Sequence, residues 1–356
     1  MKKLIKVVAI LLGSAIGIFI LLIILDKNLG GVGKITFPVA HKDTFKNDNI
    51  SKFPSMLSVQ KNQILDSSGK VIKIKGLMAK DPRKLYLEDR FNKDYYEEIF
   101  SKGCNALRVP VHPHMWEEDK YYFWRYLDPI VSWAGENNKY VVIDLHFIGN
   151  ISLGIGDEIP KLKEKPKDLA LKFWEQTAKY FKDVPNVIFE ICNEPANITA
   201  EEWYKTAEDL VDVIRKNGAD QLIIIGGIDY SYDLSWVEKT PVKDDNIAYA
   251  AHIYPSKQNW DYYFGDISQK YPVVVTEWGF TDDKVSSAKQ NYLIGSINSF
   301  GEPFLKYLEQ RNIGWIACWY DDEWEPAMFS NSFKTTTNYG EFIFNKLKSN
   351  EGYKKN

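Results

Sequence analysis

Residues 187–195 read VIFEICNEP, an apolar run that ends directly in polar and acidic residues. The same arrangement recurs at residues 273–279, which read VVVTEWG. A strand that is buried on both faces of a sheet has a continuous apolar sequence, and this is typical of parallel sheets. Both stretches therefore predict buried parallel strands that carry their polar side chains at the carboxyl end.

Similar short apolar runs lie on both sides of these two stretches. The predicted strands are residues 72–76, 106–111, 140–145, 187–191, 222–226, 247–253, 273–276 and 314–319. Helical patterns between them, such as residues 166–181 and 200–216, are long enough for the crossovers that parallel neighbours require. Eight βα units over roughly 290 residues predict a (β/α)8 TIM barrel, which typically takes about 250 residues. A doubly wound open sheet is the alternative, but no glycine-rich phosphate loop follows an early strand.

The predicted barrel domain spans residues 56–348 and opens with a β-hairpin. Residues 57–59 and 71–76 form its two strands, and the Asp66-Ser67-Ser68-Gly69 segment between them supplies turn residues. Residues 349–356 form a tail.

Residues 1–25 predict one transmembrane helix with a basic cytoplasmic end. Residues 7–25 contain no charged residue and follow Lys2, Lys3 and Lys6; about 20 apolar residues span a bilayer. The lysines favour a cytoplasmic N-terminus, so the chain that follows would lie outside. No small-residue cleavage pattern is present, which favours an uncleaved signal anchor. Residues 26–55 are predicted to be a linker, so the barrel would be extracellular and anchored to the membrane, or secreted if the segment is cleaved.

The composition excludes some classes of partner. The net charge of the 356 residues is -3, so nucleic acid is not expected to bind. The 3 cysteines lie in apolar runs without zinc-ligand spacing, and no metal or other cofactor is expected. An aromatic content of 14%, with 11 Trp, suggests flat faces on which sugar rings can stack.

The active groups of a TIM barrel project from the carboxyl ends of its strands. In this chain the predicted strands end in ionisable, amide or aromatic residues at corresponding positions. In chain order these residues are Arg108, His146, Asn193, Glu194, His252, Tyr254, Glu277 and Trp319.

This set resembles glycoside hydrolase family 5, the cellulase family of retaining (β/α)8 barrels. The resemblance covers residues 57–348, and its most specific element is NEP at residues 193–195 paired with EWG at residues 277–279. It implies a hydrolase of β-linked polysaccharide in which Glu194 is the acid/base and Glu277 the nucleophile. Endo-β-1,4-glucanase is the first expectation, and β-mannanase or another β-glycosidase of the family is the second.

The chemistry of glycoside cleavage agrees with two such carboxyl groups. The leaving oxygen must be protonated while a carboxylate attacks the oxocarbenium-like carbon, and a retaining enzyme holds the two groups about 5 to 5.5 Å apart. Ionised Glu277 then raises the pKa of Glu194. Hydrogen bonds from Arg108 and Tyr254 are expected to keep Glu277 ionised.

The resemblance assigns further roles in substrate binding. Asn193 would bind the sugar 2-hydroxyl, His146 another hydroxyl, and His252 either the acid/base or the substrate. Trp319 would be the stacking floor; because WYDDEW follows at residues 319–324 where many relatives have a Trp-Ser pair, Trp315 or Trp324 could take that role instead. Arg108 and Tyr254 are also expected to bind substrate. The tryptophans that we expect to contact substrate or line the cleft are Trp116, Trp260, Trp278 and Trp324.

Two hypotheses from other classes remain open. The sequence His112-Pro113-His114, with His146 and His252, could form the metal site of a metal-dependent barrel hydrolase. This reading leaves the NEP and EWG segments unexplained. The other hypothesis is a carbohydrate-binding barrel without turnover.

Overall fold

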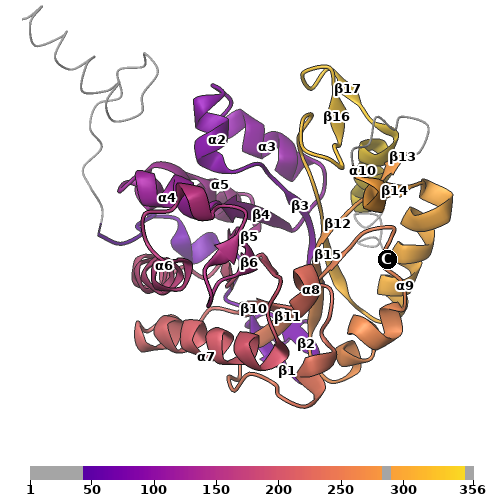
Figure 1. Cartoon of the computed structure of the whole chain (residues 1–356). Helices are drawn as coiled ribbons and strands as arrows, with labels where there is room; N and C mark the ends of the chain where they lie inside the picture. The colour runs from indigo at the N-terminus through magenta and orange to yellow at the C-terminus, as the bar shows by residue number, and fades with distance from the viewer. Residues whose placement is uncertain (1–42, 283–289, 349–356) are drawn as a thin grey trace, which may run out of the picture.

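The computed structural model describes residues 43–282 and 290–348 (Figure 1). Its centre is a closed barrel of parallel strands, each hydrogen-bonded to the next. In order around the barrel these strands are β3 (Lys75–Met78), β4 (Ala106–Val111), β5 (Tyr140–Leu145), β8 (Val187–Glu190), β10 (Ile223–Gly226), β11 (Ile247–Ile253), β12 (Val273–Trp278) and β15 (Gly314–Ala317).

Helices follow the strands and surround the barrel (Figure 1). They are α2 (Pro82–Leu87), α3 (Lys93–Ser101), α4 (Pro113–Glu118), α5 (Asp128–Glu136), α6 (Pro166–Phe181), α7 (Ala200–Lys216), α8 (Ile228–Ser231), α9 (Glu302–Gln310) and α10 (Asn338–Lys348). Shorter helical turns occupy Ile50–Lys52, Phe123–Leu127, Ile159–Lys161, Ser235–Glu238, Asp261–Gly265, Ile267–Gln269, Asn291–Leu293 and Ile297–Gly301. Helix α7 starts with a complete capping box between Thr199 and Glu202, which satisfies amide groups that the first turn leaves unpaired.

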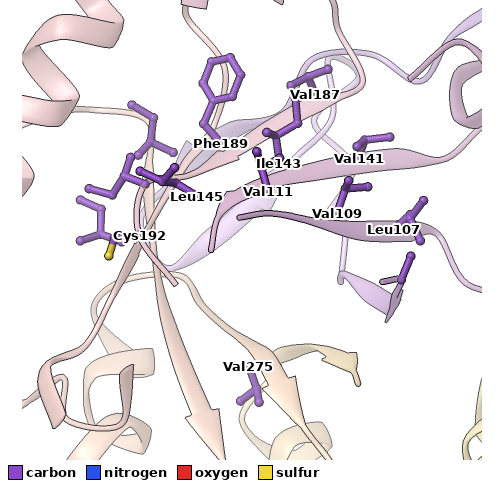
Figure 2. Packing of buried hydrophobic residues seen from close by; sticks show 14 of the residues in the cluster. Leu107, Val109, Val111, Val141, Ile143, Leu145, Val187, Phe189, Cys192 and Val275 are labelled. Atoms are coloured by element: carbon purple, nitrogen blue, oxygen red, sulfur yellow. The ribbon is translucent and has the colours of Figure 1, made fainter. Parts of the chain in front are cut away.

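The alternation of strand residues builds two apolar layers. Outward-facing residues such as Leu107, Val141 and Phe189 belong to one apolar cluster with residues of the surrounding helices. Figure 2 shows these side chains on their strands. Inward-facing residues such as Ala106 and Val142 fill the barrel. Inward positions nearer the carboxyl ends are polar, so these polar residues lie above the apolar interior of the barrel.

The predicted fold class is confirmed for the barrel. Strands β4, β5 and β11 have the predicted bounds, and so do helices α6 and α7. Strand β15 begins as predicted and ends earlier, at Ala317, whereas strand β3 begins and ends later than predicted, at Lys75 and Met78.

The N-terminal hairpin exists, but one of its strands differs from the prediction. Strand β1 (Ser58–Gln60) pairs with β2 (Gln63–Leu65), not with residues 71–76. The turn between them contains Lys61, whose positive φ of 56° allows the tight reversal. The predicted turn does form, since the Gly69 amide donates to the Asp66 carbonyl, but only the single bridge Leu65↔Val71 follows it.

The predicted transmembrane segment at residues 7–25 and most of the predicted linker lie outside the described residues. Among the residues that are described, no helix has the length and apolarity to cross a bilayer. Residues 43–55, predicted as linker, instead pack on the barrel, because Phe45 and Phe53 are both buried and the Phe45 amide donates to the Tyr180 carbonyl. The folded part of the chain therefore begins before Met56.

Small sheets form in the loops beyond the barrel. They are β7 (Ile155–Gly156), β6 (Ile148–Asn150) and β9 (Glu194–Pro195) in one sheet, β13 (Thr281–Asp282) with β14 (Ile294–Gly295), and β16 (Phe329–Ser330) with β17 (Thr335–Thr336). The first of these sheets matters for the site, because β9 contains Glu194.

Candidate active site

A cavity of about 930 Å³ opens where the barrel strands end. Its lining includes most of the polar residues predicted at strand ends, together with aromatic side chains from the loops. The lining residues include His112, His146, Asn193, Glu194, Tyr230, His252, Tyr254, Glu277, Tyr292, Trp319 and Trp324.

Glu194 is held at the cavity by backbone pairing and by a histidine. In strand β9 it lies opposite Ile148 of β6, and its amide donates to the Phe147 carbonyl at 3.0 Å. Its carboxyl Oε1 lies 2.9 Å from His252 Nδ1. The side chain is buried apart from the atoms that face the cavity, so its position is fixed by the fold.

Glu277 reaches the same cavity because strand β12 contains a bulge. Ala251 of β11 pairs with Val275 and His252 pairs with Glu277, so Thr276 is an extra residue on β12. A bulge of this kind re-aims the following side chain. Thr276 and Glu277 therefore both turn toward the barrel axis, although they are consecutive.

Two donors hold the carboxylate of Glu277. Arg108 Nη1 donates to Oε2 at 3.0 Å, and the Tyr254 hydroxyl donates to Oε1. Arg108 is fully buried, and Tyr254 is nearly so. Both donors favour the ionised form of the acid.

The two acidic groups face each other. One carboxylate oxygen of Glu194, one of Glu277 and a ring nitrogen of His252 all lie within 4.8 Å of one another. This spacing fits the roughly 5 to 5.5 Å typical of retaining glycosidases and is shorter than the roughly 6.5 to 9.5 Å of inverting ones.

The surroundings shift the pKa values of Glu194 and Glu277 in opposite directions. Burial alone would raise the pKa of Glu277, but the positive charges of His252 and Arg108 outweigh it and hold that pKa below its ordinary value. Burial raises the pKa of Glu194, and the negative charge of Glu277 adds to the increase despite the hydrogen bond with His252. The pair can therefore hold one protonated and one ionised carboxyl group.

Arg108 binds more than Glu277. Its Nε donates to Glu190 Oε2 at 2.6 Å, and its Nη2 donates to Asn193 Oδ1 at 2.8 Å and lies 3.1 Å from Asp144 Oδ2. The guanidinium is fully buried beneath the cavity. It thus positions Asn193 and Glu277, and its predicted role in direct substrate contact does not match this placement.

His146 and His112 form a second polar group in the cavity. His146 Nδ1 lies 2.7 Å from Asp144 Oδ2, and its ring centroid is 4.7 Å from that of His112. His112 in turn is bound through Nδ1 and its backbone amide to buried Asp81, at 3.1 and 2.9 Å. Burial lowers the pKa of His146 well below its ordinary value, with the nearby His112 and Arg108 charges adding to the effect. His146 is therefore a neutral hydrogen-bonding group.

Trp319 and Trp324 are the tryptophans that reach the cavity among those proposed for the stacking floor. Their rings meet edge to face with centroids 4.8 Å apart. Trp319 also contacts His146, and Trp324 contacts His112. Trp315 instead packs edge to face on Trp278 in the outer layer.

Trp116, Trp260 and Trp278 do not line the cavity, contrary to the sequence prediction. Trp116 packs on Phe123 and Phe173 in the outer layer, and Trp260 packs on Phe300, Phe304 and Tyr307. Trp278 is fully buried. It points outward because it follows inward-facing Glu277 on the strand, so its ring belongs to the apolar layer beneath the helices.

The predicted alternative metal site is not assembled from the His112-Pro113-His114 segment. The ring of His112 is bound to Asp81, and that of His114 lies 2.8 Å from Glu158. Within residues 43–282 and 290–348, the one group with metal-ligand spacing is Glu194, His252 and Glu277. Arg108 already neutralises Glu277 there, so the donor set matches an acid pair better than a cation site.

Sequence analysis missed four residues of the polar network: Asp81, Asp144, Glu190 and Thr276. Asp144 and Glu190 had a detectable signal, because each is an acid at an inward position of an apolar strand, and the two positions pair with each other across β5 and β8. Thr276 lies at an inward position by simple alternation, but the pattern could not show that Glu277 also faces inward beside it, because the bulge depends on pairing with β11.

Comparisons with known proteins agree with this geometry. The family model described as Cellulase (glycosyl hydrolase family 5) matches residues 65–322. An endoglucanase of Clostridium saccharobutylicum is 27% identical over 316 residues, which cover 85% of this chain and 65% of the relative. Endoglucanase A of Butyrivibrio fibrisolvens is 25% identical over 261 residues, 67% of this chain and 56% of the relative. The chain thus spans less than two thirds of the length of these relatives.

Solved structures share the fold. A β-glucanase from Saccharophagus degradans, crystallised in complex with cellotetraose, superposes with a TM-score of 0.80 at 24% identity, covering 88% of this chain and 98% of that one. The catalytic domain of an endoglucanase from Thermobifida fusca superposes with a TM-score of 0.69 at 21% identity, covering 82% and 97%. Together with the family match over most of the barrel, the closed parallel barrel places this chain in glycosyl hydrolase family 5, a family of glycoside hydrolases.

Proposed function

We propose that this protein hydrolyses β-1,4-linked glucan as a retaining endoglucanase, with Glu194 as acid/base and Glu277 as nucleophile. The observation that carries the proposal is the pair of buried carboxyl groups within 4.8 Å of each other, one with a raised and one with a lowered pKa. Acid and nucleophile must have opposite protonation states at one pH, and this pair meets the requirement.

In the first step, the Glu277 carboxylate attacks the anomeric carbon and forms a covalent bond to it. The bond between that carbon and the glycosidic oxygen breaks, and its electron pair stays with the oxygen. Glu194 transfers its proton to this oxygen, so the leaving sugar departs as a neutral alcohol. Arg108 and Tyr254 hold the attacking carboxylate in place while its charge is consumed.

In the second step, Glu194 is ionised and removes a proton from water. The oxygen of that water attacks the anomeric carbon, and the bond to Glu277 breaks with its electron pair returning to the carboxylate. Each step inverts the anomeric carbon, so the product keeps the β configuration. Glu194 regains its proton from the water and Glu277 regains its charge, which restores the enzyme.

Neighbouring side chains bind the sugar at the point of cleavage. Arg108 occupies the amide oxygen of Asn193, which leaves the amide NH₂ to donate to the sugar 2-hydroxyl, an interaction that strengthens in the transition state. His146 offers a neutral ring to a hydroxyl, and the Trp319 face supports the pyranose ring.

An extended polymer substrate is supported by the distribution of aromatic rings around the cavity. Tyr230 follows β10, Tyr292 lies between β12 and β15, and Trp324 follows β15, so rings come from three separate loops along the β10 to β15 side of the barrel. Tyr230 and Tyr292 are each 44% exposed. Rings from several loops give room for more than one sugar unit, which favours a polymer substrate, and the endoglucanase relatives support the same substrate class.

We also propose that residues 7–25 anchor the enzyme to a membrane with the barrel on the outer side. The basis is the uncharged run and the preceding lysines. A fractionation of the full chain and of a variant beginning at Asp43 tests this: the full chain should sediment with membranes and resist carbonate extraction. Recovery of both in the soluble fraction would refute the anchor.

A hydrolysis screen tests the activity. The chain should release reducing ends from carboxymethylcellulose and mixed-linkage β-glucan with a rapid fall in viscosity, and more slowly or not at all from mannan and xylan. Proton NMR of early products should show the β anomer first. A first product with the α anomer would refute the retaining mechanism, and preferential cleavage of mannan would refute the substrate.

A further inference from the structure

The side chain that bonds to the proposed acid/base is itself held by a buried relay. His252 Nδ1 lies 2.9 Å from Glu194 Oε1, and His252 Nε2 lies 3.1 Å from Thr276 Oγ1. The Thr276 hydroxyl lies 2.7 Å from Glu190 Oε1, and Arg108 Nε donates to Glu190 Oε2 at 2.6 Å. His252, Thr276 and Glu190 are each at most 1% exposed, so water does not compete for these bonds.

The direction of each bond in this relay follows from the chemistry of its groups. Glu190 is fully buried, and although burial opposes ionisation, the Arg108 charge and hydrogen bonds lower the pKa of Glu190 to about 2. An ionised carboxylate only accepts hydrogen bonds. The single hydroxyl proton of Thr276 is therefore donated to Glu190, which leaves Thr276 as an acceptor toward His252.

His252 must then carry a proton on Nε2, because Thr276 Oγ1 has no proton left to donate to it. In a neutral imidazole only one nitrogen carries a proton, so Nδ1 presents a lone pair to Glu194. One further proton is shared between His252 Nδ1 and Glu194 Oε1. It lies either on the carboxyl group, donating to Nδ1, or on Nδ1, donating to the carboxylate.

We propose that Thr276 and Glu190 are positioning residues that keep His252 protonated on Nε2, and thereby keep the proton for leaving-group departure on the Glu194–His252 pair. Glu190 acts through Thr276, and neither residue touches the substrate. The bulge in β12 allows Thr276 and Glu277 to face inward together, so that Thr276 can join the relay beside the proposed nucleophile. This inference rests on the proposed glycosidase reaction.

The charged and titratable groups around the pair come from several strands, and removal of the Thr276 hydroxyl leaves all of them in place. Those that face the Glu194–His252 pair are Arg108 on β4, Asp144 and His146 at the end of β5, Glu190 on β8, Cys192 after β8, Tyr254 after β11, Glu277 on β12 and Tyr292 before β14. A change in pH dependence after that removal thus reports the relay and not the loss of a charge.

The Thr276→Val variant tests the relay, because valine has nearly the same shape and lacks the hydroxyl. Without the Thr276 hydroxyl, Glu190 Oε1 faces His252 Nε2 at 3.8 Å, which is beyond hydrogen-bond distance. His252 can then place its proton on Nδ1, where it donates to ionised Glu194, and the pair holds one proton fewer at neutral pH. The alkaline limb of kcat/KM should therefore move down by about one pH unit, the equivalent of one hydrogen bond.

Leaving-group dependence separates the relay from a general structural defect. Phenyl β-cellobioside needs the acid, whereas 2,4-dinitrophenyl β-cellobioside has a leaving group that departs without protonation. At neutral pH, Thr276→Val should lower kcat/KM up to about 10-fold for the phenyl substrate, the most that a one-unit move of the alkaline limb allows. It should leave kcat/KM for the dinitrophenyl substrate nearly unchanged. Thr276→Ser should restore the phenyl activity and the alkaline limb.

Thr177→Val is the matched control. Thr177 is also fully buried, and its hydroxyl donates to the Phe173 carbonyl within α6, on the outer side of the barrel. This variant loses a buried hydroxyl without touching the relay. Its pH profile and its ratio of the two kcat/KM values should equal those of the wild type.

The outcomes are distinct. Equal losses on both substrates in Thr276→Val, with an unmoved alkaline limb, would overturn the relay. If the wild type cleaves neither cellobioside, the proposed function fails, and ¹⁵N NMR of the wild type with labelled histidine still decides the relay. The relay requires a protonated Nε2 in His252, identified by difference with His252→Gln, and a bare Nε2 would overturn it. The same spectrum decides the question if Thr276→Val does not fold.

Discussion

Removal of one hydroxyl group from Tyr254 should change the pH at which the enzyme becomes active. The Tyr254 hydroxyl and Arg108 Nη1 are the two side-chain donors to Glu277, one to each carboxylate oxygen. Tyr254→Phe deletes the first and leaves the second at 3.0 Å. Phenylalanine fills the same space, so the barrel interior stays packed.

The size of the effect follows from the geometry of the carboxylate. A hydrogen bond to a charged group contributes about 1.5 to 3 kcal/mol, and about 1.4 kcal/mol corresponds to one pKa unit. Glu277 lines the cavity, so a water molecule can replace part of the lost bond, and the expected rise in its pKa is at the low end, about one unit. Glu277 must be ionised to attack. The acid limb of kcat/KM should therefore move to higher pH by about one unit, with activity lost first at low pH.

The assay is kcat/KM for an aryl β-cellobioside measured from pH 3 to pH 8 in buffers of constant ionic strength. Tyr140→Phe is the matched control, because Tyr140 also faces the barrel interior but donates its hydroxyl to the Ser55 carbonyl. Its acid limb should equal that of the wild type. An acid limb that does not move in Tyr254→Phe, or that moves to lower pH, would refute the reasoning about Glu277.

Three further predictions test separate parts of the account. Glu194→Ala should lower kcat/KM for phenyl β-cellobioside by at least about 10²-fold, and azide should restore turnover of an activated aryl cellobioside and yield β-cellobiosyl azide; an α-azide product would exclude Glu194 as acid/base. Trp278→Ala should destabilise the fold by about 3 to 5 kcal/mol in urea titrations, whereas Trp324→Ala should raise KM for cello-oligosaccharides with little change in stability; the reverse pattern would contradict their placement. Exhaustive treatment with EDTA should leave activity unchanged, and a loss that zinc reverses would return the metal hypothesis.

The barrel could be predicted because its strands are short and continuously apolar. Strands such as β4 and β5 lie in the interior on both faces, so their sequences alone predicted their bounds. The N-terminal hairpin was harder, because β1 and β2 are only three residues each and the turn at Lys61 has no glycine. Two residues between short strands give little signal.

The residues at the site were predictable where a strand kept its alternation. Arg108, His146 and His252 are all inward positions at strand ends, and the structure brings them to one place. Trp278 was assigned wrongly because the bulge at Thr276 reverses the direction of every later side chain on β12. Such a change of register depends on pairing with β11 and has no local signature in the chain.

The buried acids Asp144 and Glu190 are the part of the polar network that the sequence pattern did not reveal. Asp144 and Glu190 appear as isolated acids inside apolar strands, and Arg108 compensates both of them. A buried carboxylate without a partner would be costly. An acid at an inward position of a barrel strand, in a chain that also has an arginine at such a position, is therefore a useful signal for the residues that support a catalytic site.

The central claim is that Glu277 forms a covalent bond to the sugar. Incubation with 2,4-dinitrophenyl 2-deoxy-2-fluoro-β-cellobioside, followed by proteolysis and tandem mass spectrometry, tests it directly, because the fluorine slows the second step and traps the intermediate. The account predicts one fluorocellobiosyl group per chain, located on Glu277, with release of one equivalent of dinitrophenol. A label on any other residue, or steady hydrolysis with no label on the chain, would contradict it.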